Sequence, residues 1–194
     1  MAPIVAIYVV WAGWMVSWWT AAVWANPAVK HASLFQEIPH RLLTVAGAIL
    51  LFGFYSNHYD LHYQLWQHPL NGVAGWTMAV LVFAGFAFSW WARIHLGRLW
   101  SGTITRKTNH HVVDTGPYGL VRHPIYTGIA LAVLATAIVS GTPSSFAGAA
   151  LMIAGWYLKA RTEEHFLREE LGPEAYDSYA RRVPMVVPFL NWHS

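Results

Sequence analysis

The stretch that decides the fold is Gly116-Pro117-Tyr118-Gly119-Leu120-Val121-Arg122-His123-Pro124-Ile125-Tyr126-Thr127-Gly128. It stands directly before a long apolar run, so the backbone must turn where a membrane segment begins. Pro124 disfavours the helical region for the residue before it and suits the first position of a helix. We therefore expect a turn and then a helix N-terminus, where free backbone N–H groups lie beside Arg122 and His123.

The composition is that of a membrane protein. Of the 194 residues, 56% are hydrophobic and only 11% are charged, about half the charged fraction usual in soluble domains. The 12 tryptophans and 9 tyrosines suit the boundaries between lipid and water. The chain has no cysteine, which excludes disulfides, thiolate metal sites and a cysteine nucleophile. The formal charge of +3 is too small and too scattered to indicate a nucleic acid partner.

The apolar runs predict an all-α, polytopic integral membrane protein, with residues 1–194 as one domain. Five transmembrane helices are expected, over residues 3–25, 42–56, 71–92, 125–140 and 144–160. The first run lacks a basic start and is longer than a usual signal peptide core, which disfavours that alternative. The last two spans form a hairpin, because Gly141-Thr142-Pro143-Ser144-Ser145 interrupts a charge-free run.

The fifth span is expected to continue as a charged C-terminal helical extension up to Leu171. A short amphipathic helix at residues 174–182 and an apolar tail at residues 185–190 follow. The tail is too short to span the bilayer, so we expect it to lie at the interface or to pack on the domain.

Five spans would place every lysine and arginine in loops or extensions on one side of the membrane. The positive-inside rule then puts the N-terminus outside and the C-terminus in the cytoplasm. Residues 93–124 and 159–194 would share the cytoplasmic side and form the ligand site. The expected location is the inner (plasma) membrane of a prokaryote.

Two adjacent carboxylates, Glu163 and Glu164, follow the fifth span near the headgroups, where an uncompensated negative charge is costly. Either Arg122 or a cationic ligand would compensate them, and a purely structural pair of Arg122 with Glu164 is an equal alternative. The turn offers N–H donors for a carboxylate, and nearby rings suit a base or a sulfonium. Those rings belong to Tyr118, Tyr126, Trp156 and Tyr157. The pattern indicates a cytoplasmic pocket for a zwitterionic or nucleotide-like ligand.

Other histidines raise the question of a metal site. His58 and His62 are spaced i,i+4, but no third ligand beyond Asp60 is near them in the sequence, so we predict no metal centre. His110 and His111 precede the turn, where they are either a solvated loop pair or neighbours of a bound ligand.

From about residue 93 to residue 190 the chain resembles the isoprenylcysteine carboxyl methyltransferase family. Its motifs occur in order as Leu99-Trp100-Ser101, residues 112–118, residues 122–128, Glu163-Glu164 and residues 176–184. The Arg-His-Pro and Glu-Glu elements are also similar to those of phospholipid N-methyltransferases.

The resemblance implies S-adenosyl-L-methionine as the methyl donor and S-adenosyl-L-homocysteine as its product. Carried over by position, the donor site contains Val112, Val113, Gly116, Tyr118, Arg122, His123, Pro124, Tyr126, Glu163 and Glu164. In the family, an arginine one helical turn before the glutamates meets the substrate carboxylate. Here Lys159 stands at that place, and Arg161 is two residues away on another face. The catalytic candidates are therefore Lys159, Arg161 and His123, with His123 or a glutamate as the base for an amine or hydroxyl acceptor.

Three functions follow as hypotheses. The first is carboxyl O-methylation of an isoprenylcysteine-like, lipophilic small molecule that enters from the bilayer. The second is N-methylation of a membrane lipid such as phosphatidylethanolamine. The third is a haem-binding or transport protein, which is disfavoured because the predicted spans lack charged residues. Arg181 and Arg182 are expected to face the anionic leaflet.

Overall fold

The structure is a computed structural model that describes residues 1–24, 30–31, 34–53, 65–66, 70–100, 105–106 and 112–190. Its helices are α1 (Pro3–Thr20), α2 (Leu34–Phe52), α3 (Gly72–Leu96), α4 (Pro124–Ser140), α5 (Pro143–Leu171) and α6 (Pro173–Arg182). Short 3-10 turns are η1 (Ala21–Trp24), η3 (Gly97–Leu99) and η4 (Gly116–Gly119). The strands of the described part, β1 (Lys30–His31) and β2 (Thr105–Arg106), form one antiparallel pair. The predicted helical class is confirmed.

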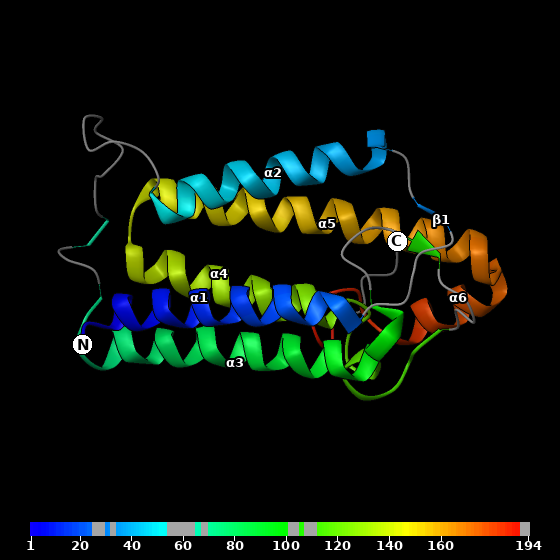
Figure 1. The fold of residues 1–194 in the computed structure, drawn as a ribbon, viewed down its shortest axis with the longest axis horizontal. Helices are drawn as coiled ribbons and strands as arrows, with labels where there is room; N and C mark the ends of the chain where they lie inside the picture. The colour runs from blue at the N-terminus through cyan, green and yellow to red at the C-terminus, as the bar shows by residue number, and fades with distance from the viewer. Residues whose placement is uncertain are drawn as a thin grey trace.

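The long helices lie side by side (Figure 1). α2 packs on α5, α1 packs on α3, and α4 contacts both α3 and α5. α6 lies beyond the bundle, at the end where α4 begins and α5 leaves it. This end brings together segments that are far apart in the sequence.

Proline opens four of these helices, where its missing N–H would have no partner in any case. These prolines are Pro3, Pro124, Pro143 and Pro173. Gly141 ends α4 in the left-handed conformation at φ 65°, and Thr142 caps α5 through a reciprocal capping box with Ser145. The predicted break between the last two long helices is confirmed at this turn.

Small residues let the helices approach closely. A Cβ on Gly128 of α4 would overlap the backbone of Gly85 in α3, and one on Gly148 of α5 would overlap Gly47 in α2. Such contacts are typical of helix pairs in membranes, where backbone proximity replaces a hydrophobic driving force.

Among the described residues, two helices, α1 and α3, are long and apolar enough to cross a membrane, and α4 is a shorter apolar helix. The predicted span at residues 42–56 corresponds to α2, which begins earlier, at Leu34. Arg41 and Arg93 were expected in loops, but they lie inside α2 and α3. α3 continues to Leu96 because basic residues in a last turn complement the helix dipole, and Gly97 at φ 56° then ends it.

Several residues discussed above lie outside the described residues. They are His58, Asp60, His62, Ser101, His110 and His111.

Candidate active site

The turn before α4 is packed against the last turn of α3. We call residues 114–123 the elbow. Gly116 has a φ of 57°, and a Cβ there would run into the ring of His95. His95 Nε2 lies 2.9 Å from Thr115 Oγ1, and the His95 ring stacks over Tyr118, with centroids 6.4 Å apart. These contacts with His95 fix the conformation of the elbow against the end of α3.

The C-terminal tail closes the elbow from the other side. The backbone N–H of Arg122 donates to the carbonyl of Pro184 at 2.8 Å, and that of His123 donates to Met185 at 3.0 Å. The turn was expected to offer N–H donors to a ligand, but those of Arg122 and His123 are not available, because the carbonyls of Pro184 and Met185 accept their hydrogen bonds. The expectation that the tail packs on the domain is confirmed by these contacts.

α6 is also fixed to the elbow. The Tyr179 hydroxyl donates to the carbonyl of Tyr118 at 2.8 Å, and Arg182 pairs with Asp114 at 3.1 Å. Val112 packs against the buried cluster that α6 forms with the residue after it, Val183. Tyr118 is itself buried.

The Arg122 guanidinium is held by protein atoms. Nε and Nη2 donate to the two carboxylate oxygens of Glu164, at 2.7 and 3.3 Å. Nη1 donates to the carbonyls of Ala180 and Val183, at 2.9 and 2.7 Å. The structural Arg–Glu pair that the sequence left open is therefore formed, and it is bidentate.

His123 adds to this pair, with Nε2 at 3.1 Å from Glu164 Oε1. Burial would raise the pKa of the Glu164 carboxyl, but hydrogen bonds from His123 and Arg122 and their charges outweigh it and lower the pKa to about 2. Glu164 is therefore ionised over the physiological pH range. Burial and then the charge of Glu164 raise the pKa of the neighbouring Tyr176 hydroxyl, which stays neutral.

Glu163 has different surroundings. The Tyr126 hydroxyl donates to its Oε1 at 2.8 Å, while Lys159 Nζ and His123 Nδ1 are 3.8 and 3.7 Å from its carboxylate. The side chain is 21% exposed, compared with 14% for Glu164. A carboxylate with one short hydrogen bond has capacity for further donors. Beside it the His123 and Tyr126 rings stack on each other, with their centroids 5.5 Å apart and an interplanar angle of 12°.

Lys159 and Arg161 differ in orientation. The Lys159 ammonium is largely buried, lies near Glu163 and is 5.8 Å from the Tyr126 ring centroid, whereas Arg161 is exposed. Trp156 packs against the apolar core, and Tyr157 is exposed. Pro124 is buried at the start of α4, and Val113 is half-buried.

The sequence did not indicate that His40 of α2 lies near the charged groups of the site. Its side chain is buried, and its Nε2 has no hydrogen-bond partner within the described part of the chain. Burial, and then the nearby charge of Lys159, lower the pKa of His40, whereas the charge of Glu163 acts in the opposite direction and raises it. No motif signals His40, because it lies on a helix before the region of family resemblance.

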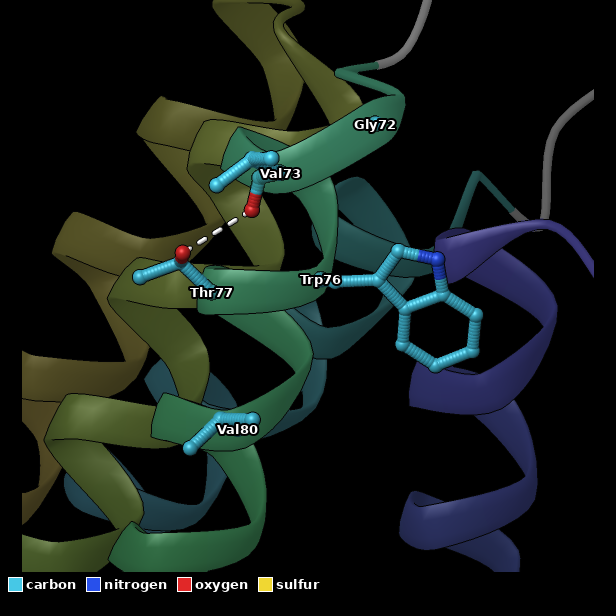
Figure 2. A pocket seen from close by; sticks show the side chains of 5 residues that line it. All are labelled: Gly72, Val73, Trp76, Thr77 and Val80. Carbon is cyan, nitrogen blue, oxygen red and sulfur yellow. Dashed lines mark hydrogen bonds between the residues drawn. The ribbon is translucent and has the colours of Figure 1, made fainter.

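A surface hollow elsewhere on α3 is lined by Gly72, Val73, Trp76, Thr77 and Val80 (Figure 2). Trp76 points from α3 towards α1, and Thr77 donates to the carbonyl of Val73 at 2.8 Å. The hollow lies at the start of α3, whereas the elbow packs on its end. It is therefore separate from the polar cluster.

The comparisons with known proteins find similarity over the part of the chain that contains this site. The family model described as isoprenylcysteine carboxyl methyltransferase matches residues 77–169, which include the elbow and both glutamates. Over these residues the chain is similar to the isoprenylcysteine carboxyl methyltransferase family. The chain is 28% identical over 151 residues to protein-S-isoprenylcysteine O-methyltransferase B of Arabidopsis thaliana, covering 67% of this chain and 75% of that protein.

A second relative carries a different name. The chain is 37% identical over 98 residues to the cobalt-zinc-cadmium resistance protein CzcN of Cupriavidus metallidurans, covering 50% of this chain and 44% of the relative. A solved structure of the eukaryotic intramembrane Ras methyltransferase ICMT superposes with a TM-score of 0.50 at 18% identity. That match covers 86% of this chain and 56% of the solved chain, so it shows a shared fold over about half of the larger protein. The fold is that of an integral membrane protein.

Proposed function

We propose that the chain is an S-adenosylmethionine-dependent membrane methyltransferase that esterifies the carboxylate of an isoprenylcysteine-like amphiphile. The family-model match over residues 77–169 and the similarity to the Arabidopsis relative support this assignment. The observation that carries it is the junction between the elbow and the end of α5. There Glu163 meets Tyr126, His123 and Lys159 in a partly open position.

The side chains at this junction fit the methyl donor. Glu163 retains acceptor capacity for an ammonium group, and the stacked rings of His123 and Tyr126 suit a sulfonium or a base. Arg122 is assigned to holding Glu164, because its donors are directed to Glu164 and to two backbone carbonyls. The positions carried over by resemblance thus include residues that contact the methyl donor, such as Glu163, and residues that hold other side chains in place, such as Arg122.

When bound, S-adenosylmethionine supplies an electrophilic methyl group. A carboxylate acceptor needs no general base, so the task of the chain is to align the acceptor and to exclude water. Lys159 is the cation placed to attract that carboxylate, beside Glu163 and Tyr126. A lysine supplies a point charge in place of the bidentate fork of an arginine. His123 is assigned to positioning, since Glu164 holds its Nε2.

The membrane placement is part of the proposal. We assign one span to the apolar part of each of α1–α5, the fifth over residues 144–160, with the N-terminus outside and the junction in the cytoplasm of a prokaryotic cell. In this arrangement the soluble methyl donor enters from the cytoplasm, and the lipophilic acceptor enters from the bilayer.

The test offers purified protein a methyl-labelled donor with three acceptors: N-acetyl-S-farnesylcysteine, its carboxamide and phosphatidylethanolamine. The expected product is a base-labile methyl ester of the free acid alone. Label in the carboxamide or in phosphatidylethanolamine would contradict the proposal, as would an unlabelled acid when S-adenosylhomocysteine binding is intact. Lys159→Met should form less ester than Arg161→Met, the matched control.

A further inference from the structure

A buried arginine lies outside the junction just described. Arg93 is in the last turn of α3, and its side chain is only 3% exposed. Its guanidinium carbon lies 3.3 Å from the ring centroid of Trp100, 4.5 Å from that of Trp18 and 5.9 Å from that of Trp90. These three tryptophans form what we call the tryptophan cage.

The cage is built from separate elements. Trp18 comes from α1, Trp90 from α3 and Trp100 from the residue after η3. Trp90 is fixed by a hydrogen bond from its indole N–H to Ser17 Oγ at 3.2 Å, and Trp18 packs edge-on against both other rings. The guanidinium therefore occupies a fixed place at one end of the bundle.

The charge of Arg93 is not compensated within the described part of the chain. Nη1 is buried without a hydrogen-bond partner, and none of the described residues forms an ion pair with Arg93. Aromatic faces attract a cation but do not accept the in-plane N–H bonds of a guanidinium. A buried charge is retained only where a counter-charge and hydrogen bonds offset its desolvation. An oxyanion would supply both the counter-charge and the hydrogen-bond acceptors that Arg93 lacks.

The surroundings indicate an amphiphilic source for that oxyanion. The cage joins α1 and α3, which among the described residues are both long and apolar enough to cross a membrane. Next to the cage residues in the sequence, Trp19, Trp91 and Ile94 are exposed apolar side chains on the same two helices. Tryptophan is enriched at the level of lipid headgroups. An anionic head at Arg93 would thus leave apolar surface beside it for acyl chains.

We propose that Arg93 and the tryptophan cage form a binding site for the phosphate group of an anionic phospholipid. The site lies on α1 and α3, and its function does not depend on which acceptor is methylated. An arginine fork gives two parallel hydrogen bonds to a phosphate, which suits Arg93 better than a lysine. The bound lipid would hold the ends of α1 and α3 together next to His95, which contacts the elbow.

The experiment uses the full-length purified protein and three probes: phosphatidylglycerol, phosphatidylcholine and inorganic phosphate. Native mass spectrometry measures the lipid retained by the wild type, Arg93→Met and Arg93→Lys, and a melting curve is recorded with and without each probe. Arg168→Met is the matched control, because it removes an exposed cation with the same change of charge.

The wild type and Arg168→Met should retain phosphatidylglycerol at least about tenfold more than phosphatidylcholine, and Arg93→Met should lose that preference. Phosphatidylglycerol should raise the melting temperature of the wild type but not of Arg93→Met. Arg93→Lys should retain an intermediate preference, and it also serves as the test if Arg93→Met does not fold.

Three results would overturn the proposal. One is equal retention of phosphatidylglycerol by Arg93→Met and the wild type. Another is an equal loss of melting temperature in Arg93→Met with and without lipid, which a purely structural arginine would give. The third is Arg93-dependent binding of inorganic phosphate at the lipid's affinity, which would assign the site to a soluble anion.

Discussion

Two consecutive glutamates on α5 serve two different regions of the molecule. Glu164 faces the closed region, where it accepts two hydrogen bonds from the Arg122 guanidinium and lies beside His123 Nε2. The same guanidinium also donates to the carbonyls of Ala180 and Val183. Glu163 faces the open region, where it has one short hydrogen bond, from Tyr126, and a lysine nearby. Successive helical residues point about 100° apart, so adjacent carboxylates reach different surroundings. A repeated residue in a motif need not have a repeated role.

The largest expected effect breaks the closed region. Glu164→Ala leaves the Arg122 charge uncompensated and only 13% exposed, so we expect stability to fall by about 3 to 5 kcal/mol. S-adenosylhomocysteine binding should be lost with it. Chemical unfolding in detergent measures the effect. The control is Glu169→Ala on the same helix, whose side chain is exposed and should change stability by less than about 1 kcal/mol. Equal losses in both variants would contradict the comparison.

The pH dependence sharpens the same contrast. The pKa of the Glu164 carboxyl is lowered from 4.5 to about 2 in the folded state. Its contribution is therefore complete above pH 4.5 and is lost as the pH falls towards 2, up to roughly 3 kcal/mol. Unfolding measured between these pH values should show a steep loss for the wild type and a shallower one for Glu164→Gln. Parallel curves would exclude Glu164 as the group that titrates.

A smaller effect is expected in the open region. Glu163→Gln removes the carboxylate proposed to accept the donor's ammonium but keeps a hydrogen-bond acceptor for Tyr126. Affinity for S-adenosylhomocysteine should fall by about tenfold, with stability close to that of the wild type. Calorimetric titration measures the first quantity and thermal unfolding the second. A loss of stability as large as that of Glu164→Ala would mean that the two regions do not differ.

The smallest effect concerns the acceptor. Lys159→Met should raise the KM for N-acetyl-S-farnesylcysteine by about fivefold to tenfold, since an ammonium–carboxylate hydrogen bond is lost. Arg161→Met should leave that KM unchanged, because Arg161 is exposed on another face. Steady-state kinetics with the donor at saturation separates the two. Equal KM changes would remove Lys159 from the acceptor site.

Local sequence signals predicted the turns that shape the bundle. Gly141 and Pro143 marked the break between α4 and α5, and Pro124 marked the start of α4, because both residue types act through their own backbone. The pairing of Arg122 with Glu164 was recognised as one alternative from charge and membrane depth. Such inferences need only short-range geometry or strong electrostatics.

Contacts made by backbone atoms of distant segments could not be predicted in the same way. The carbonyls of Pro184 and Met185 close the elbow, and no side-chain pattern encodes a carbonyl as a partner. Arg93 was assigned to a loop because its charge suggested the end of a span. The tryptophans that bury it come from α1 and from beyond η3, and only the folded structure brings them together.

The most direct test removes one group from the ligand and one from the protein. Calorimetry would compare S-adenosylhomocysteine with its analogue lacking the amino group, for the wild type, Glu163→Gln and Glu164→Gln. Loss of the amino group should weaken binding to the wild type. The same loss is expected for Glu164→Gln if that variant still binds S-adenosylhomocysteine. Binding to Glu163→Gln should be nearly the same with and without the amino group. If Glu163→Gln loses as much affinity as the wild type on removal of that group, Glu163 does not hold the donor.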